Sequence, residues 1–188
     1  MKITSVGDNC IDHYVLTNSK SAGGNSINVA VYLHRLGLDA SYVSAVGNDE
    51  NGKFILSELS KKGVDVSHVD IAEGSTAVTE VKLVDGERIL GDYDEGVLET
   101  FKLSEKQKKF ILQHDMICSA LWGNIHNDLK FFKDNGMIVA FDGATRPFDV
   151  AGKIAMKSSD YFFFAVDEYK PSMKEEVRKT MKEIKEFV

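Results

Sequence analysis

The first residues able to do chemistry are in the run Gly7–Asp12. Two carboxylates, Asp8 and Asp12, and the amide of Asn9 fall within its six positions. The run follows the β-rich segment Lys2–Val6, so it lies at the carboxyl end of a strand, where open α/β folds bind ligands. Carboxylate and amide oxygens accept hydrogen bonds from several hydroxyls, which suits a polyol. The alternative is that Asp8 and Asn9 only form a turn and Asp12 is a solvated loop residue.

A second group opens the first predicted helix. Gly23 and Gly24 precede Asn25, and Asn28 follows one turn later on the same side of the helix. The glycines let a ligand approach backbone N–H groups closely, and asparagine amides both donate and accept, which matches hydroxyls. Asn25 is open to a second interpretation, as an ordinary N-cap. The candidate substrate-binding residues of the two groups are Asp8, Asp12, Gly24, Asn25 and Asn28.

Two charged groups later in the chain are further candidates. The segment Gly91–Gly96 is acidic. Its Asp92, Asp94 and Glu95 either bind a cationic group of a substrate or belong to a solvated turn. Arg146 follows another predicted strand, so we expect it at the same sheet edge as the first carboxylates. Its guanidinium either holds a phosphate or forms an ordinary surface pair with an aspartate.

The run Gly47–Phe54 fits a phosphate-binding loop up to Lys53, but Phe54 stands where the loop needs a serine or threonine. Asp49 and Glu50 would also repel phosphate oxygens. We therefore predict an ordinary turn that leads into a helix. None of the five histidines has metal-ligand spacing, so they predict no metal site.

These groups depend on the elements that position them. Apolar residues at helical spacing predict helices over residues 25–36 and 52–62, each closed by a glycine, Gly37 or Gly63. Further helices are predicted over 127–134 and 171–188. The predicted strands cover residues 2–6, 41–46, 116–121, 137–141 and 161–166. This alternation favours an α/β fold with a mostly parallel central sheet covered on both faces.

One region breaks the alternation. Thr76–Val84 alternates with period two, Asp85-Gly86 is a hairpin turn, and Glu87–Leu90 returns. His13–Leu16 is another β-like piece. We expect a small β-sheet over about residues 12–20 and 75–96, which covers a ligand or pairs with a second copy. Because the main sheet stops at a helix with a strand edge uncovered, we also expect the chain to be incomplete at its C-terminus.

Composition narrows the class of protein. The 188 residues carry a formal net charge of −6, which disfavours nucleic acid and acidic membrane surfaces as partners. Apolar residues make up 43% and charged residues 28%, as in ordinary soluble domains. Cys10 and Cys118 are the only cysteines, which predicts a reducing, cytoplasmic environment without disulfides. No apolar run reaches the roughly 20 residues of a membrane span, and no leader segment is expected.

The chain resembles the ribokinase-like, PfkB-type family of carbohydrate kinases along essentially its whole length. The residues that carry the resemblance are Gly7–Asp12, Gly23–Asn25 with Asn28, Val46–Asp49 with Gly52, and Lys62–Asp65. Within that family it is most similar to the kinases that act on fructoselysine. The segments behind this closer similarity are Gly7–Asp12, Gly91–Tyr93 with Glu95–Val97, Leu121–Gly123 and Ala140–Asp142.

The resemblance implies a ribokinase-like α/β sandwich with a β-sheet lid, often a homodimer clasped through the lids. It implies transfer of the γ-phosphoryl of ATP, with Mg²⁺, to a sugar hydroxyl, here the 6-hydroxyl of fructoselysine or a related fructosyl-amino acid. Asp12, Gly24, Asn25 and Asn28 match the family's sugar-binding positions.

The resemblance also covers the phosphate and metal segments, with two departures. Asp142 and Arg146 match the ends of a DxNxR signature near the phosphates, where Ala144 replaces the asparagine. Glu168 matches the acidic end of an NxxE signature tied to magnesium, where Ala165 replaces the asparagine.

The family's GAGD signature, whose aspartate is the general base, does not occur in the sequence. We therefore expect residues 1–188 to be the N-terminal part of a kinase domain, with no catalytic base before Val188. Two alternatives are a non-catalytic module that binds sugar or dimerises, and a kinase for another ketose or a nucleoside.

Overall fold

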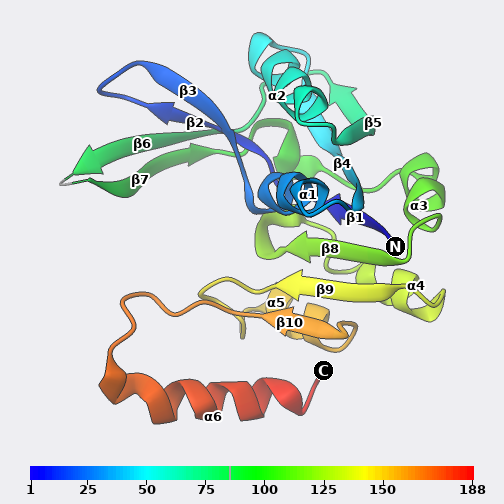
Figure 1. The fold of residues 1–188 in the computed structure, drawn as a ribbon, viewed down its shortest axis with the longest axis vertical. Coiled ribbons are helices and arrows are strands. Elements are labelled where there is room, and N and C mark those ends of the chain that lie inside the picture. The colour runs from blue at the N-terminus through cyan, green and yellow to red at the C-terminus, as the bar shows by residue number, and fades with distance from the viewer. Residues whose placement is uncertain (85) are drawn as a thin grey trace.

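The framework of the molecule is a six-stranded sheet of order β10-β9-β8-β1-β4-β5 in which all paired strands are parallel (Figure 1). The structure, a computed structural model, describes residues 1–84 and 86–188. β1 lies inside the sheet, where Ile3 is in register with Ala40 on one side and Met116 on the other. The strands are β1 (Lys2–Val6), β4 (Asp39–Gly47), β5 (Asp65–Ala72), β8 (Met116–Ala120), β9 (Ile138–Asp142) and β10 (Tyr161–Phe163).

Helices pack on both faces of this sheet. Because strand side chains alternate, Tyr42 and Val46 of β4 join one buried cluster, with apolar residues of α1 and α2, whereas Val43 and Ala45 join another, with residues of α3, α4 and α5. The helices are α1 (Asn25–Arg35), α2 (Glu50–Lys61), α3 (Glu105–Ile111), α4 (Leu129–Asp134), α5 (Val150–Met156) and α6 (Lys174–Lys185). Three 3₁₀ turns are η1 (Gly96–Thr100), η2 (Leu121–Gly123) and η3 (Pro171–Met173).

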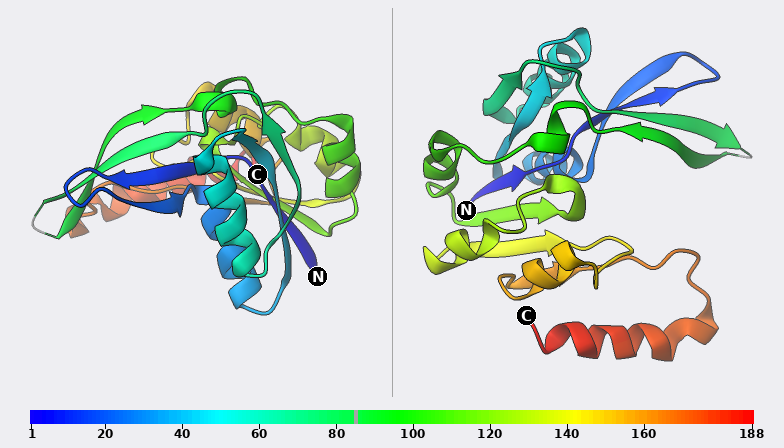
Figure 2. Two further views of the ribbon diagram at one scale, coloured as in Figure 1. Left: turned by 90° about the horizontal axis from the view of Figure 1, so that it is seen from above. Right: turned by 180° about the vertical axis from the view of Figure 1, so that it is seen from behind.

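A second, four-stranded sheet projects from the first, as Figures 1 and 2 show. Its order is β3-β2-β6-β7, with β2 and β6 parallel and the other two pairs antiparallel. The strands are β2 (Cys10–Tyr14), β3 (Ser19–Gly23), β6 (Val78–Val84) and β7 (Glu87–Asp94). The small sheet was expected, and the turn residue Asp85 lies outside the described residues.

Several boundaries differ from the sequence-based predictions. β2 begins at Cys10 instead of His13, so Asp12 lies in a strand and not in a loop. β7 continues to Asp94 instead of stopping at Leu90, because Leu90–Asp94 still pairs with β6. The last strand ends at Phe163 and is shorter than predicted. The elements β3, β5, α3 and α5 were not predicted.

Glycines end the first two helices as expected. Gly37 and Gly63 both have φ of +81°, the left-handed conformation that closes a helix. α2 begins at Glu50, where Asp49 caps it by accepting the N–H of Gly52 at 2.8 Å. The segment is therefore a helix N-terminus preceded by a turn, as predicted, and its carboxylate fills the place that a phosphate would need.

The C-terminal helix α6 lies beyond β10 (Figure 1). Its apolar stripe is buried at Ile184 and half-buried at Val177, which confirms the predicted helix. Within the described residues, no helix combines the length and the apolar character that crossing a membrane requires.

Candidate functional site

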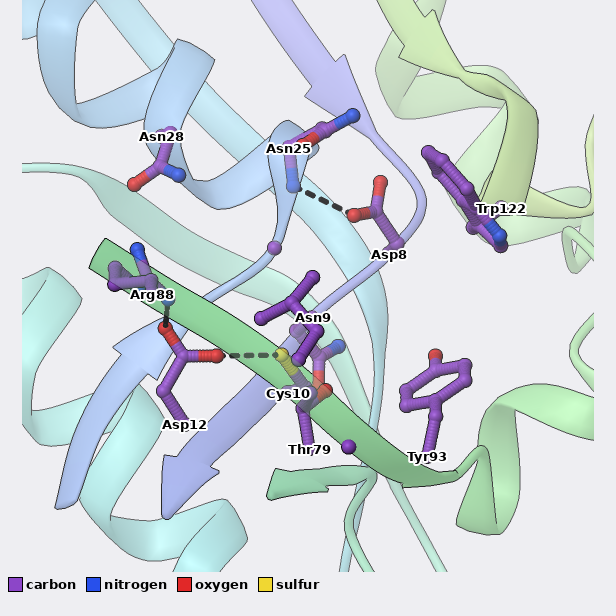
Figure 3. Close-up of a pocket in the computed structure, with 13 residues that line it drawn as sticks. Asp8, Asn9, Cys10, Asp12, Asn25, Asn28, Thr79, Arg88, Tyr93 and Trp122 are labelled. Carbon is purple, nitrogen blue, oxygen red and sulfur yellow. Dashed lines mark hydrogen bonds and ion pairs between the residues drawn. The ribbon is translucent and has the colours of Figure 1, made fainter. Parts of the chain in front are cut away.

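A pocket of about 580 Å³ lies where the two sheets meet. Its wall comes from the end of β1, the start of α1, the strands of the small sheet and the 3₁₀ turn η2 (Figure 3). The lining residues are Asp8, Asn9, Cys10, Asp12, Gly24, Asn25, Asn28, Thr79, Arg88, Leu90, Gly91, Tyr93 and Trp122. The five predicted substrate-binding residues nearest the N-terminus are therefore brought to one place.

The carboxylate of Asp8 is hydrogen-bonded to the start of α1. Its carboxylate accepts the backbone N–H of Asn25 at 2.6 Å and that of Ser26 at 3.3 Å, and the Ser26 hydroxyl donates to it at 2.8 Å. Burial raises the pKa of Asp8 above its ordinary value, while these hydrogen bonds act in the opposite direction. Asp8 therefore fixes the helix that carries the asparagines.

Asp12 points into the pocket from β2. Its Oδ2 accepts a hydrogen bond from Arg88 Nη2 at 2.6 Å, and Cys10 Sγ lies 3.5 Å from Oδ1. A side chain on Gly23, which pairs across from Cys10, would collide with the Asp12 carboxylate, because its Cβ would lie 2.7 Å from Oδ1. Within the described residues, the only ion-pair partner of Asp12 is Arg88, and the Arg88 side chain is half exposed.

The helix mouth positions the two asparagines. Gly24 has φ of +114°, and a Cβ there would lie 2.8 Å from the Asn9 Cα, so only glycine fits without a shift. Asn25 Nδ2 lies 3.5 Å from Asp142 Oδ2, which links the pocket to the end of β9. Asn28 is exposed and lines the same pocket as Arg88 (Figure 3).

The floor of the pocket consists of buried polar groups. Asn9 is 1% exposed, and its Nδ2 donates to the Tyr42 hydroxyl, Ser44 Oγ and the Ala45 carbonyl. Its Oδ1 is buried and accepts no hydrogen bond within the described residues. Burial raises the pKa of the Cys10 thiol to about 12, so this thiol is a neutral wall atom at physiological pH.

Sequence analysis missed the residues that the small sheet contributes. Thr79, Arg88 and Leu90 of the hairpin line the pocket, and so does Tyr93, which belonged to the predicted acidic turn. The only available signal was the period-two pattern, because side chains on one face of a strand recur every second residue. Trp122, for which a position capping the core was the more common expectation, lines the pocket and is 42% exposed.

A β-bulge divides the acidic segment. Thr79 pairs with Tyr93 and Val81 pairs with Leu90, so two residues of β7, Gly91 and Asp92, oppose one residue of β6. The extra residue turns Tyr93 toward the pocket and leaves Asp92 outside its lining. The structure thus does not join Asp92 to the other predicted site residues.

Glu95 and Arg146 line a second pocket of about 540 Å³ that shares Tyr93 and Trp122 with the first. Arg146 Nε lies 2.9 Å from Asp149 Oδ2, and both side chains are about half exposed. The pair with Asp149 agrees with the alternative that Arg146 forms an ordinary surface ion pair. Because the second pocket adjoins the first, Arg146 could also contact a phosphate there.

Glu168 stands apart from both pockets. It is exposed, has φ of +46°, and lines neither cavity. No group of three or more histidine, cysteine, aspartate or glutamate side chains could hold a metal ion in residues 1–84 and 86–188. Magnesium in phosphoryl-transfer sites binds through one or two carboxylates together with the phosphates of the nucleotide, so Glu168 stays a prediction for such a contact.

Comparison with known proteins adds sequence similarity to this geometry. The pfkB family carbohydrate kinase model matches residues 4–122. "Fructoselysine 6-kinase" of Escherichia coli (strain K12) is 39% identical over 140 residues, which cover 74% of this chain and 54% of that protein. "Fructosamine kinase FrlD" of Bacillus subtilis (strain 168) is 31% identical over 185 residues, which cover 96% and 64%. The chain spans about half to two thirds of the length of these curated relatives.

Solved structures show the same arrangement of elements. Ribokinase of Arabidopsis thaliana, complexed with ribose and ATP, matches with a TM-score of 0.77 and 18% identity, covering 96% of this chain and 68% of that one. Ribokinase from Giardia lamblia matches with a TM-score of 0.73 and 16% identity, covering 98% and 66%. At these identities the similarity concerns the fold alone.

Proposed function

Because the chain belongs to the pfkB family of carbohydrate kinases, we propose that its pocket binds a fructosyl-amino acid, fructoselysine or a close relative. In the whole protein, ATP is the second substrate and its γ-phosphoryl passes to the 6-hydroxyl of the sugar. Two relatives named for fructoselysine and fructosamine support this substrate class over a simple ketose.

The observation that carries the proposal is the convergence of Asp12, Asn25 and Asn28 on one cavity. A carboxylate accepts hydrogen bonds from two sugar hydroxyls, and each amide supplies both a donor and an acceptor. Asp8 does not compete for the ligand, since its oxygens hold the N-terminus of α1. A polyol fits this set better than an apolar or purely cationic ligand does.

The small sheet is the proposed lid, over about residues 12–20 and 75–96. Arg88, Leu90 and Tyr93 of β7 form one wall of the pocket, so movement of the hairpin would open or close it. A closed lid excludes water from the reacting hydroxyl and favours transfer to the sugar over hydrolysis of ATP.

Arg146 is the proposed phosphate contact. Its guanidinium is half exposed in the second pocket, and an incoming phosphate would replace Asp149 as its partner. The general base is not assigned to any described residue.

The remaining proposals concern partners and location. A second copy of the chain is the proposed protein partner, bound through the small sheet, and neither nucleic acid nor a membrane is proposed as a partner. The net charge of −6 and the two free cysteines support a protein of the reducing cytoplasm.

Trp122 offers a direct test of substrate class, because it is the single tryptophan and lines the pocket. We expect its fluorescence to change on titration with fructoselysine at lower concentration than with fructose or ribose. A response to ribose alone would contradict the substrate proposal. Trp122→Phe is the control, which removes the signal while calorimetry still detects binding.

An assay of ADP release separates the proposal from a non-catalytic sugar-binding module. Release that depends on fructoselysine supports a kinase. Because no described residue is assigned as the general base, the assay is made on the whole protein, where binding without such release supports the module.

A further inference from the structure

Arg88 is the only cationic side chain among the pocket-lining residues of the described chain. It reaches the pocket from β7 and lies over the Tyr14 ring, with its guanidinium carbon 6.0 Å from the ring centroid. Within the described residues its side chain makes one hydrogen bond, from Nη2 to Asp12 at 2.6 Å. A guanidinium has five N–H donors in a planar fork, so most donors of this pocket-lining, half-exposed side chain are free to bind a ligand.

Both carboxylates of the pocket already have hydrogen-bond partners, whereas Arg88 has N–H donors that still lack an acceptor among the described residues. Asp8 is bonded to the start of α1, and Asp12 is paired with Arg88. The acidic residues that could take a cation lie elsewhere, since Asp92 is outside the lining of this pocket and Glu95 lines the second one. The hairpin wall thus offers a fork of donors, and a carboxylate matches that fork with two parallel hydrogen bonds.

We propose that Arg88 binds the carboxylate of the amino-acid part of the substrate and makes the site selective for sugar derivatives that carry a carboxylate over those that lack one. This inference rests on the proposed function, because it names the part of a fructosyl-amino acid that the hairpin contacts. Asp12 and the asparagines of α1 hold the hydroxyls, while Arg88, which is hydrogen-bonded to Asp12, holds the carboxylate end (Figure 3).

The test compares fructoselysine with its decarboxylated analogue, the fructosyl derivative of 1,5-diaminopentane. By calorimetry, we expect the wild-type chain to bind fructoselysine about 10- to 100-fold more tightly, as befits hydrogen bonds to a charged group. Arg88→Gln should lose this preference and retain its affinity for the analogue. Arg88→Lys keeps the charge without the fork and should retain part of the preference.

Lys82→Gln is the matched control, because Lys82 pairs with Ile89 on the other face of the same hairpin and should not alter the preference. Equal binding of both ligands by the wild-type chain, or equal weakening of both by Arg88→Gln, would overturn the inference and leave the proposed function standing. Failure of the wild-type chain to bind either ligand would overturn the proposed function itself. The wild-type comparison needs no variant, so equal binding of both ligands overturns the inference even if Arg88→Gln does not fold, and Arg88→Lys then tests the residue itself.

Discussion

Asp8 and Asp12 are the same residue type four positions apart, yet their surroundings give them different roles. Asp8 is 6% exposed and accepts two backbone N–H groups and a hydroxyl from the start of α1. Asp12 faces the cavity, and its ion-pair partner Arg88 is half exposed. A ligand can therefore exchange with the partner of Asp12, whereas replacing the partners of Asp8 would uncap a helix.

The first prediction concerns Asp8→Ala. The substitution leaves the N–H groups of Asn25 and Ser26 without their acceptor, so the free energy of unfolding should fall by about 1–3 kcal/mol. Urea denaturation measures the change. Asp8→Asn, which keeps one oxygen acceptor, should lose less stability. Unchanged stability of Asp8→Ala with lost sugar binding would instead mean that Asp8 contacts the ligand directly.

At the scale of elements, strands and helices with strong periodicity were predictable from sequence. α1 and α2 with their closing glycines, and the parallel strands β1, β4, β8 and β9, follow from apolar spacing and β-rich runs. β3 was missed because its sequence, Ser19–Gly23, has little β-propensity and becomes a strand only by pairing with β2. The edge strand β5 lacks a simple alternation, and its pairing with β4 is irregular.

The site was predictable where it follows one strand–helix unit and not where it depends on pairing between strands. Asp12, Asn25 and Asn28 belong to that unit. Arg88 meets Asp12 across 76 positions of sequence, through β2–β6 and β6–β7 pairing that no local pattern encodes. The bulge by which Tyr93, and not Asp92, lines the pocket likewise depends on the pairing register of β6 and β7.

The second prediction concerns Asp49, which joins the start of α2 to the start of the hairpin. It accepts the N–H of Gly52 at 2.8 Å, and the Thr76 N–H and hydroxyl at 2.9 and 2.6 Å. Burial raises the pKa of Asp49, but these hydrogen bonds outweigh burial and hold it below the ordinary value. The resulting stability is present above the ordinary pKa, near 4, and is lost as pH falls through the lower folded value.

Asp49→Asn should therefore reduce the free energy of unfolding at pH 7 by about 1 kcal/mol, and the difference from wild type should shrink below about pH 4. Urea denaturation at several pH values measures it. Asp70→Asn, at an exposed position of β5, is the control and should show no such trend. A difference that is constant from pH 7 to pH 3 would mean that the charge of Asp49 contributes nothing.

At the scale of the whole molecule, the two sheets have separate tasks. The parallel sheet with its helices supplies the buried core, and the small sheet supplies one wall of the pocket and an outer surface. On the face away from Arg88, Val84 and Ile89 are 52% and 48% exposed. Exposed apolar side chains on a projecting sheet are typical of an interaction surface.

The third prediction is that this face joins two copies of the chain. Ile89→Glu places a charge in the interface, so sedimentation velocity should show a dimer for wild type and a monomer for the variant. Leu36→Glu is the control, because Leu36 is 77% exposed at the end of α1 and should leave the dimer intact. A monomeric wild-type chain at micromolar concentration would contradict the prediction.

The proposal that the cavity between the sheets binds sugar hydroxyls through Asp12 is tested by a calorimetric titration of fructoselysine. Asp12→Asn should weaken binding at least about 10-fold, because it removes a charged acceptor of hydroxyl hydrogen bonds. Asp92→Asn, which changes the same charge outside the pocket lining, should bind as wild type does. Equal affinities for wild type and Asp12→Asn would contradict the claim.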